Sequence, residues 1–365
     1  MKFNLLGRYL KVIASYSLGY PLYTPDSVSI VVTNSCNLKC VMCDFWKDTA
    51  KASEGINLSE FKKLFADLKS SGVRMVHMTG GEPFLRKDLI DILKSAKANG
   101  LKTAVLTNGT LIPEDSLLEF VRNVDLVYVS LDSPSGVQHE DIRGVPNIFE
   151  KITRNVKLLV KTIKDNSLSV RVILCTTITS KGMHDPVEMV SLARSSGVNG
   201  IIYNPASSIY YGYTTFLKND DSKSIIPRDA YGKMIDKIIA LMADPANMIR
   251  SNPFYLSASK EFLGGNEKYY KFPCFGGGYN GPLIAFDGTV FPCCAWNMPI
   301  GNIKEDSFNK IWRSDAAREA RRKIKRGECS VCHHHTRTFD FIWRAPFLFK
   351  DPAMLIRGYK LISRM

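Results

Sequence analysis

Long apolar runs are missing from this sequence of 365 residues. No stretch approaches the 18 consecutive apolar residues that a membrane-spanning helix needs, so we expect no transmembrane span. Residues 3–18 are amphipathic, because Arg8 and Lys11 interrupt the apolar positions. This segment lacks the uninterrupted apolar core and the small-residue cleavage site of a secretory signal, and we interpret it as a surface helix.

Acidic residues are too few to balance the basic ones, since 35 Asp and Glu face 49 Lys and Arg and the net charge is +14. Such an excess is compatible with an anionic substrate, a nucleic acid or a membrane surface. The densest basic run, residues 318–326, contains Glu319 and has a helical pattern. A solvated helix face explains it better than a binding patch, so we expect no nucleic acid partner.

Signs of disorder are also absent, and the apolar content of 45% is enough for a large core. The length favours one large domain and a smaller one. Nine cysteines are many for a reducing compartment, but most fall into two clusters far apart in the chain. This distribution suits metal binding better than disulfides.

The first cluster places Cys36, Cys40 and Cys43 in one short stretch that directly follows a strand-like run at residues 28–32. Three thiolates at x3 and x2 spacing can bind three irons of a cubane iron–sulfur cluster and leave the fourth iron without a protein ligand. The alternatives are a zinc site, which normally takes four ligands, and three unrelated cysteines.

Strand and helix signals alternate from residue 27 to residue 204. The predicted strands are residues 27–33, 75–79, 102–107, 126–131, 169–177 and 200–204, and the predicted helices between them are residues 58–71, 87–99, 114–123, 148–165 and 186–196. Repeated strand–helix units predict parallel strands with helices outside, and six units fit a partial (β/α)6 barrel of the TIM type better than a complete one. A doubly wound open sheet is the alternative.

Polar and glycine-rich residues follow the predicted strands, where the loops of such folds build their sites. They include Gly80-Gly81-Glu82, Asn108, Ser130 and Asp132. Paired glycines let the backbone come close to a ligand, and a glutamate can accept from an amine. A tight turn for the glycines and a helix cap for Ser130 or Asp132 are the structural alternatives. Arg143 is either part of a surface helical turn or an anion contact.

The cysteine triplet followed by Gly-Gly-Glu resembles the radical S-adenosylmethionine (SAM) superfamily over residues 26–210. The resemblance implies a 4Fe-4S cluster held by Cys36, Cys40 and Cys43, with SAM chelating its open iron. It implies that Gly80, Gly81 and Glu82 receive the SAM amino group, that Ser130 and Asp132 contact the ribose or the carboxylate, and that Phe45 lies near the adenine. One electron from the reduced cluster then cleaves SAM to a deoxyadenosyl radical, which abstracts hydrogen from substrate.

The second cluster comprises Cys274, Cys293, Cys294, Cys329 and Cys332. Asp287-Gly288 lies between apolar runs and predicts a β-hairpin that brings Cys274 and Cys293 together. Two thiol pairs suit either a fully ligated iron–sulfur cluster or zinc. The spacing from Cys274 to Cys293 resembles the opening of the SPASM domain, and the lack of further cysteines resembles its shorter twitch form. That resemblance implies an auxiliary cluster on Cys274, Cys293, Cys329 and Cys332, with Cys294 as a replacement for Cys293. We interpret His333, His334 and His335 as a polar surface turn; the alternative is that one of them ligates a metal.

These observations predict an α/β protein with a partial barrel and a small carboxyl-terminal α+β auxiliary domain. The expected segments are an amphipathic segment (1–25), the barrel (26–225), a linker with a helix at 228–242 and an irregular region to residue 270, the auxiliary domain (271–345) and a tail (346–365). The tail is aromatic and basic and is expected to pack on the barrel; peripheral membrane contact together with the amino terminus is the alternative. Because such clusters are oxygen-labile, we expect a cytoplasmic protein.

The resemblance implies hydrogen abstraction followed by substrate oxidation or bond formation, with the auxiliary cluster as electron acceptor or substrate ligand. The expected partners are a small-molecule or peptide substrate, which the basic charge suggests is anionic, and an electron donor such as flavodoxin or ferredoxin. One alternative is a maturase of ribosomally made peptides that forms C–C or C–S bonds. A non-catalytic iron–sulfur carrier or scaffold is the alternative from another class, and Gly80-Gly81-Glu82 argues against it.

Overall fold

The computed structural model describes residues 11, 14–43, 45–47, 55–205, 227–263, 274 and 276–329. In the described part of the chain, no helix has both the length and the apolar content to cross a membrane. The predictions on His333–His335, Cys332 and the tail lie outside the described residues. The amino-terminal helix is described only at residues 11 and 14–18.

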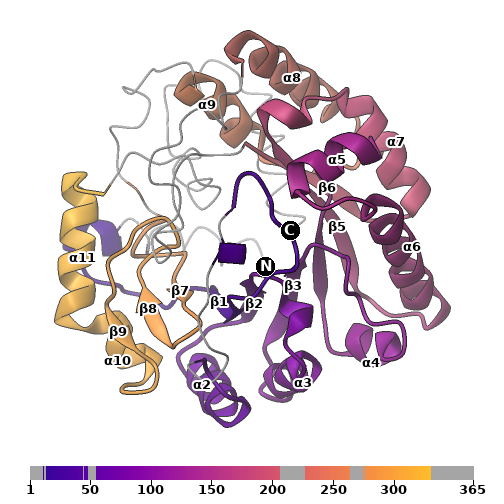
Figure 1. Cartoon of the computed structure of the whole chain (residues 1–365). Coiled ribbons are helices and arrows are strands. Elements are labelled where there is room, and N and C mark those ends of the chain that lie inside the picture. Colours follow the sequence, from indigo (N-terminus) through magenta and orange to yellow (C-terminus); the bar gives the residue numbers. More distant parts are fainter. Residues whose placement is uncertain are drawn as a thin grey trace.

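Six parallel strands form a curved sheet with helices on its outer side (Figure 1). The strands are β1 (Ser27–Thr33), β2 (Met75–Gly80), β3 (Lys102–Thr107), β4 (Leu126–Ser130), β5 (Arg171–Ile178) and β6 (Gly200–Pro205). The helices that follow them are α2 (Leu58–Ser70), α3 (Leu89–Ala98), α4 (Leu117–Arg122), α5 (Gly136–Arg143), α6 (Phe149–Asp165) and α7 (Pro186–Ser196). This α/β arrangement confirms the partial barrel.

Helix boundaries follow local signals in the sequence. Helix α2 begins at Asn57, whose side chain accepts from the backbone N–H of Glu60 while the Glu60 carboxylate accepts from the Asn57 N–H. Helix α7 begins with Asp185 as a cap and Pro186 as its first residue, and it ends at Gly197 in the left-handed conformation. These signals explain why the predicted and observed bounds of α7 agree.

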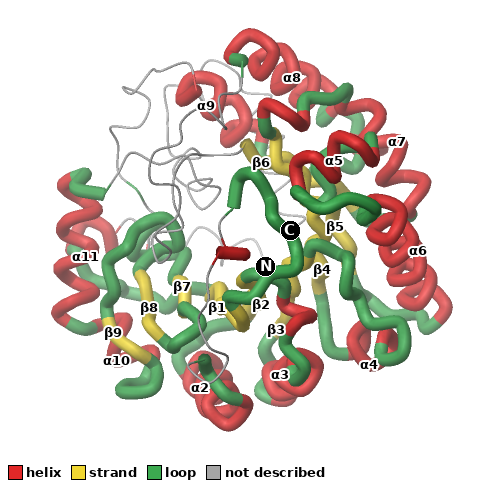
Figure 2. Tube along the Cα trace, viewed as in Figure 1, coloured by secondary structure: helices red, strands yellow, loops and turns green. Residues whose placement is uncertain are grey.

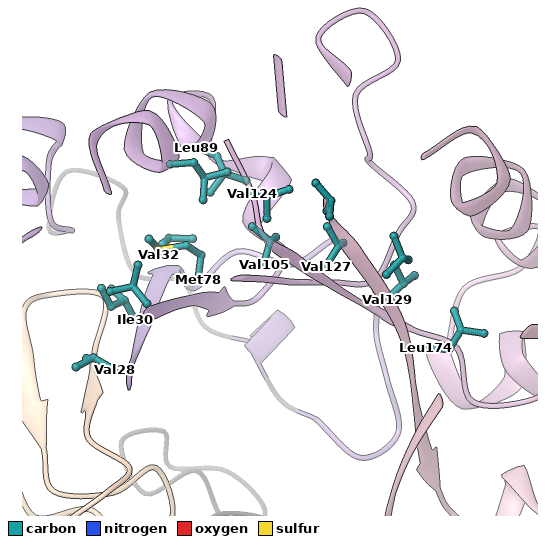
Figure 3. Close-up of a cluster of buried hydrophobic side chains, with 14 of the residues drawn as sticks. Val28, Ile30, Val32, Met78, Leu89, Val105, Val124, Val127, Val129 and Leu174 are labelled. Atoms are coloured by element: carbon teal, nitrogen blue, oxygen red, sulfur yellow. The ribbon is translucent and has the colours of Figure 1, made fainter. Parts of the chain in front are cut away.

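Alternate residues of each strand face the helices or the concave side of the sheet. The helix-facing residues form the buried core in Figure 3, with Ile30, Met78, Val105, Val127 and Leu174 in a continuous layer. Because a parallel sheet packed under helices buries this whole face, its residues are aliphatic. The side chains between them point to the concave side, which leaves that face for the site.

A short antiparallel extension continues the same sheet. Strand β7 (Leu283–Ile284) pairs parallel with β1, and β8 (Thr289–Phe291) and β9 (Gly301–Asn302) follow with antiparallel pairing. The turn between β7 and β8 contains Asp287-Gly288, which confirms the predicted hairpin. In Figure 2 the helices α10 (Phe308–Arg313) and α11 (Asp315–Arg326) flank this extension. The nine strands have the order β6-β5-β4-β3-β2-β1-β7-β8-β9, so β1 is the barrel strand that joins the extension.

The linker contains two helices, α8 (Arg228–Leu241) and α9 (Pro253–Leu263). The prediction of an irregular region up to residue 270 was therefore wrong at α9. The sequence signal was weak there because the helix begins at a proline and follows Ser251 and Asn252, which are typical of turns. The segment before it covers the outer edge of β6, since Arg250 N donates to Ile201 O at 2.7 Å.

Candidate functional site

The loop that carries Cys36, Cys40 and Cys43 follows β1 and is held by the end of α5. The N–H of Lys39 donates to Arg143 O at 3.0 Å, and the N–H of Val41 donates to Ile142 O at 2.9 Å. A Cβ on Gly144 would lie 2.3 Å from Lys39 O, so only glycine permits this approach. The loop therefore takes its shape from a helix about 100 residues further along the chain.

The three thiols lie in a partly buried environment and influence one another electrostatically. Burial raises the pKa of Cys43 to about 12, and the neighbouring thiols Cys40 and Cys36 add to the shift. Burial also raises the pKa of Cys36, again with a contribution from Cys40. Such thiols ionise only when a cationic group offsets their charge, as iron does.

A single-ion site is not preformed at this loop. No three His, Cys, Asp or Glu side chains of the described residues are arranged so that they could hold one metal ion. Zinc requires its ligands to converge on one tetrahedral centre. The chemistry of the donors, three thiols of neighbouring residues, fits an iron–sulfur cluster. Their assignment as cluster ligands remains a prediction.

Gly80 and Gly81 lie directly against the start of the cysteine loop. The N–H of Gly81 donates to Thr33 O at 2.8 Å, and a Cβ on Gly81 would lie 2.0 Å from Ser35 O. The next residue continues the contact, since Glu82 N donates to Ser35 O at 2.8 Å. The glycine pair therefore joins β2 to the cysteine loop, whatever ligand it also serves.

Glu82 is fully buried, and its carboxylate accepts three hydrogen bonds. The donors are Thr107 Oγ1 at 2.7 Å, Asn108 N at 2.7 Å and Phe84 N at 3.2 Å. Burial raises the pKa of Glu82 to about 7, although these donors act in the opposite direction. Its ionisation is therefore balanced near neutral pH, and a bound ammonium group would favour the carboxylate form.

The side chain of Asn108 connects the end of β3 to the cysteine loop. Its Nδ2 donates to Asn37 Oδ1 at 2.9 Å, and Asn37 Nδ2 donates to Thr110 Oγ1 at 2.8 Å. The Thr110 N–H donates to Asn108 Oδ1 at 2.9 Å. Sequence reasoning had singled out Asn108 but not Asn37 or Thr110. Polar residues at the carboxyl ends of neighbouring strands were the signal available for Thr110.

Asp132 and Arg143 form a buried bidentate ion pair. Arg143 Nε lies 2.6 Å from Asp132 Oδ2, and Arg143 Nη2 donates to Asp132 Oδ1 at 2.9 Å. Thr177 N donates to the same Oδ1 at 2.9 Å, and Arg143 Nη1 donates to Cys40 Sγ at 3.5 Å. Burial alone would lower the pKa of Arg143, but Asp132 and Cys40 together raise it. Arg143 thus contacts two internal acidic groups, and contacts of this pair with SAM stay a prediction.

His139 completes this buried group and was not predicted to have a role in the site. Its Nδ1 accepts from Asp132 N at 3.2 Å. Burial and the charge of Arg143 lower the pKa of His139 to about 4, so the ring is neutral at physiological pH. The i, i+4 spacing of His139 and Arg143 on one helix was the sequence signal that could have joined them.

Ser130 and Phe45 lie in different parts of the fold. Ser130 ends β4, where it pairs in register with Cys175 of β5. Phe45 is 5% exposed and belongs to a buried cluster whose members come from β1, β7 and β8. That cluster, which we call the inter-site cluster, contains Val31, Phe45, Leu283, Ala285, Phe286, Phe291 and Cys294, with Cys43 packed against it. The predicted adenine contact of Phe45 stays a prediction.

The second cysteine set is brought together around the hairpin. A Cβ on Gly277 would lie 3.5 Å from Cys274 Sγ and 3.7 Å from Cys293 Cβ. Backbone N–H groups reach both sulfurs, from Gly277 to Cys274 at 3.2 Å and from Ala295 to Cys293 at 3.2 Å. Burial raises the pKa of Cys293 well above its usual value, with contributions from Cys294, Cys274 and Cys329. Hydrogen bonds from backbone N–H groups to sulfur are typical of iron–sulfur sites.

Cys294 and the adjacent Cys293 lie in different environments. It is 8% exposed and packs in the inter-site cluster, whereas Cys293 adjoins the loop of Cys274. Three of the four predicted auxiliary ligands, Cys274, Cys293 and Cys329, are among the described residues, and Cys293 is influenced electrostatically by the other two. This arrangement favours Cys293 over Cys294 as the ligand.

Two family models match the chain. The model described as the Radical SAM superfamily matches residues 30–193. The model described as an iron–sulfur cluster-binding domain, SPASM, matches residues 274–334. The first match contains the cysteine loop, the glycine pair and the Asp132–Arg143 pair. The second begins at Cys274 and extends beyond Cys329.

The chain is also similar to individual proteins, at 16–26% sequence identity. The AdoMet-dependent heme synthase of Methanosarcina barkeri is 24% identical over 90% of this chain and 97% of its own length. The subtilosin biosynthesis protein AlbA of Bacillus subtilis is 26% identical over 88% of this chain and 70% of its own length. Among solved structures, Streptococcus suis SuiB bound to its precursor peptide SuiA superposes with a TM-score of 0.63 at 18% identity, covering 96% of this chain and 79% of that one. The structure of anSMEcpe with bound AdoMet also superposes with a TM-score of 0.63, at 16% identity, covering 92% of this chain and 99% of that one.

Proposed function

The chain is a radical SAM protein with a carboxyl-terminal SPASM iron–sulfur domain, and from this premise we propose that it oxidises its substrate by hydrogen abstraction. The two domains imply 4Fe-4S clusters and SAM as cofactors. When bound and reduced, these cofactors supply one electron for SAM cleavage and a radical that removes a hydrogen atom from substrate. An oxidation then requires a second electron to leave the substrate, and the auxiliary site is the proposed acceptor.

The proposed ligands of the SAM-binding cluster are Cys36, Cys40 and Cys43. The proposed ligands of the auxiliary cluster are Cys274, Cys293, Cys329 and Cys332. Glu82 is the proposed acceptor for the SAM ammonium, because its carboxylate is held in one orientation by Thr107 and Asn108. The buried Asp132–Arg143 pair keeps the cysteine loop in place and excludes water from its base.

The position of β1 carries this proposal. The cysteine loop follows β1, and β7, which leads into the hairpin of Cys293, is hydrogen-bonded to the other edge of β1 from β2. The inter-site cluster contacts both regions, since Cys43 of the cysteine loop packs against it and Cys294, the residue after Cys293, belongs to it. Two cysteine loops that adjoin paired strands of one sheet, with a buried apolar cluster in contact with Cys43 and Cys294, support electron transfer from a substrate bound at the concave face to the auxiliary site.

Peptide maturation is a second candidate. AlbA takes part in the biosynthesis of a bacteriocin, and SuiB is seen with a precursor peptide. These relatives support a peptide as substrate, while the heme synthase relative supports a tetrapyrrole. Both proposals for this chain require SAM cleavage, so the first test concerns SAM and the second concerns the substrate.

The test is anaerobic reconstitution with iron and sulfide, followed by incubation with SAM and dithionite. We expect 5′-deoxyadenosine as a product, and about eight iron atoms per chain from two cubane clusters. A Cys36/Cys40/Cys43 triple alanine variant should retain about four iron atoms and form no deoxyadenosine. A wild-type protein with full iron content that never cleaves SAM would instead support an electron carrier. Once SAM cleavage is observed with dithionite, flavodoxin and ferredoxin are tested as electron donors in its place.

A further inference from the structure

A buried arginine lies beside the second cysteine set. Arg321 of α11 is 1% exposed, and its Nε donates to Gly278 O at 2.7 Å while its Nη2 donates to Trp312 O at 2.8 Å. Its neighbours on α11, Arg318, Arg322 and Arg326, pair with carboxylates. Within the described residues, Arg321 has no such ion pair, and its Nη1 has no hydrogen-bond partner.

Aromatic rings surround the guanidinium in place of an acid. Its central carbon lies 4.7 Å from the centroid of the Trp312 ring and 5.5 Å from that of Tyr279. Cation–π contacts of this kind stabilise a buried cation only in part. Burial lowers the pKa of Arg321 to about 10, so the group remains protonated at neutral pH. The protein therefore keeps a positive charge in its interior without a described counter-ion.

The segment Gly277-Gly278 lies against both the Arg321 side chain and the cysteines. The Arg321 side chain packs on Gly278, where a Cβ would lie 3.0 Å from Arg321 Cγ. The adjacent residue, Gly277, borders Cys274 Sγ and Cys293 Cβ. Arg321 thus lies behind the loop that positions two of the proposed ligands, and its bond to Gly278 O fixes that loop.

We propose that Arg321 is the counter-charge of the auxiliary cluster and sets its reduction potential. This inference rests on the proposed function, because it requires an anionic iron–sulfur cluster on Cys274 and Cys293. A cluster with thiolate ligands carries net negative charge, which increases by one when it accepts an electron. A fixed cation nearby stabilises the reduced form more than the oxidised form and so raises the potential. Arg321 acts as a positioning residue, through its charge and through Gly278.

A purely structural role makes a different prediction. If Arg321 only anchored α11 through its hydrogen bonds, a neutral donor would replace it better than a charged residue with another shape. Arg321→Gln keeps amide donors and removes the charge, whereas Arg321→Lys keeps the charge and loses the planar donor fork. The two variants therefore separate charge from hydrogen bonding.

The experiment uses the full chain with Cys36, Cys40 and Cys43 replaced by alanine, so that only the auxiliary cluster is loaded. Iron, sulfide and zinc are counted, and the potential is measured by redox titration with electron paramagnetic resonance. We expect Arg321→Gln to lower the ratio of reduced to oxidised cluster at fixed poise about tenfold, which corresponds to about 59 mV for a one-electron couple. The same ratio in Arg321→Lys should stay within about twofold of that in the parent. Arg322→Gln, on the same helix but exposed and paired with Glu319, is the matched control and should not change it.

An unchanged potential in a fully loaded Arg321→Gln protein overturns the inference. A shift in Arg321→Lys as large as that expected for glutamine also overturns it, and this result remains readable if the glutamine variant does not fold. A parent that holds zinc or no metal refutes the auxiliary cluster itself, which is a failure of the proposed function. Stability is followed by thermal unfolding in parallel, since a structural role would change the melting temperature without moving the potential.

Discussion

The cysteine loop after β1 is held by contacts from distant parts of the barrel, whereas Cys274 and Cys293 are held by contacts from residues close to them in the chain. The first loop donates backbone hydrogen bonds to the end of α5 and accepts them from Gly81 and Glu82, which follow β2. The second site depends on N–H groups only two or three residues from each sulfur, and on α11 behind it. The barrel site is therefore part of the main fold, and the auxiliary site is a local unit added to its edge.

The two cysteine sites also differ in the charged side chains beside them. Arg143 reaches Cys40, but Asp132 neutralises it at 2.6 Å. Arg321 lies beside the auxiliary loop without a carboxylate partner among the described residues. A cation that is already paired stabilises an added electron less than an unpaired one. We therefore expect the barrel cluster to have the lower potential, which suits donation of an electron to SAM, and the auxiliary cluster to have the higher one.

Removing the auxiliary site should break this comparison most completely. A Cys274/Cys293 double alanine variant is expected to lose about four iron atoms but to keep SAM cleavage, because the barrel site is held independently. Oxidised or cross-linked product should fall below detection. Iron analysis, deoxyadenosine release and mass spectrometry of the substrate measure the three effects. Loss of SAM cleavage as well would show that the two sites are not independent.

Breaking the Asp132–Arg143 pair tests how far the barrel site belongs to the fold. Arg143→Met leaves a buried carboxylate unpaired, and we expect it to lower the free energy of unfolding by about 3–5 kcal/mol. Arg74→Met removes an ion pair with Asp26 whose arginine side chain is 69% exposed, and about 0–1 kcal/mol is expected there. Urea unfolding of the apo proteins compares the two. Equal losses would contradict the role given to the buried pair.

Acid should weaken the barrel site through His139. The pKa of this residue is about 4 in the folded protein against a usual value of 6.5. As pH falls, the unfolded chain is therefore protonated at His139 before the folded protein is. The stabilisation is present above pH 6.5 and is lost as pH falls toward 4, by at most about 3 kcal/mol. His139→Gln should show a flatter dependence over this range in urea unfolding at each pH. Parallel curves for both proteins would argue against it.

The smallest expected effect concerns SAM binding at Glu82. The pKa of about 7 means that the carboxylate form, which pairs with the SAM ammonium, becomes dominant above neutral pH. Affinity for SAM in the reconstituted protein should therefore rise with pH between about 6 and 8. Glu82→Gln should remove this rise and weaken binding by about 1.5–3 kcal/mol. Anaerobic equilibrium dialysis measures both, and a pH-dependent Glu82→Gln protein would assign the titration to another group.

Local patterns were sufficient for much of the fold. The predicted strands at residues 27–33 and 102–107 agree with β1 and β3, because alternation of apolar residues and flanking turns are local signals. Asp287-Gly288 predicted its hairpin for the same reason. Helix α9 was missed, since its formation depends on packing against α8 more than on its own starting residues.

The candidate site was predictable as a set of residues but not as a set of contacts. Glu82 was named from its place at a strand end, and Arg143 was named as an anion contact or part of a helical turn. Their partners Thr107 and Asp132 come from other strand ends, and no spacing rule indicates which pairs will meet. Arg321 was assigned to a solvated helix face together with its neighbours, and only packing against Trp312 and Gly278 buried it.

The sequence by itself determined the parallel α/β core, the two cysteine sets and the short glycine-glutamate segment, because each depends on residue types at short and fixed spacing. Tertiary structure alone decided that β7 pairs with β1, which joins the strand before the first cysteine loop to the hairpin before Cys293 in one sheet. It also decided that Arg143 pairs with Asp132, whereas Arg321 has no carboxylate partner within the described residues. Strand order and buried charge pairing depend on which distant segments exclude water together, and that is a property of the folded chain.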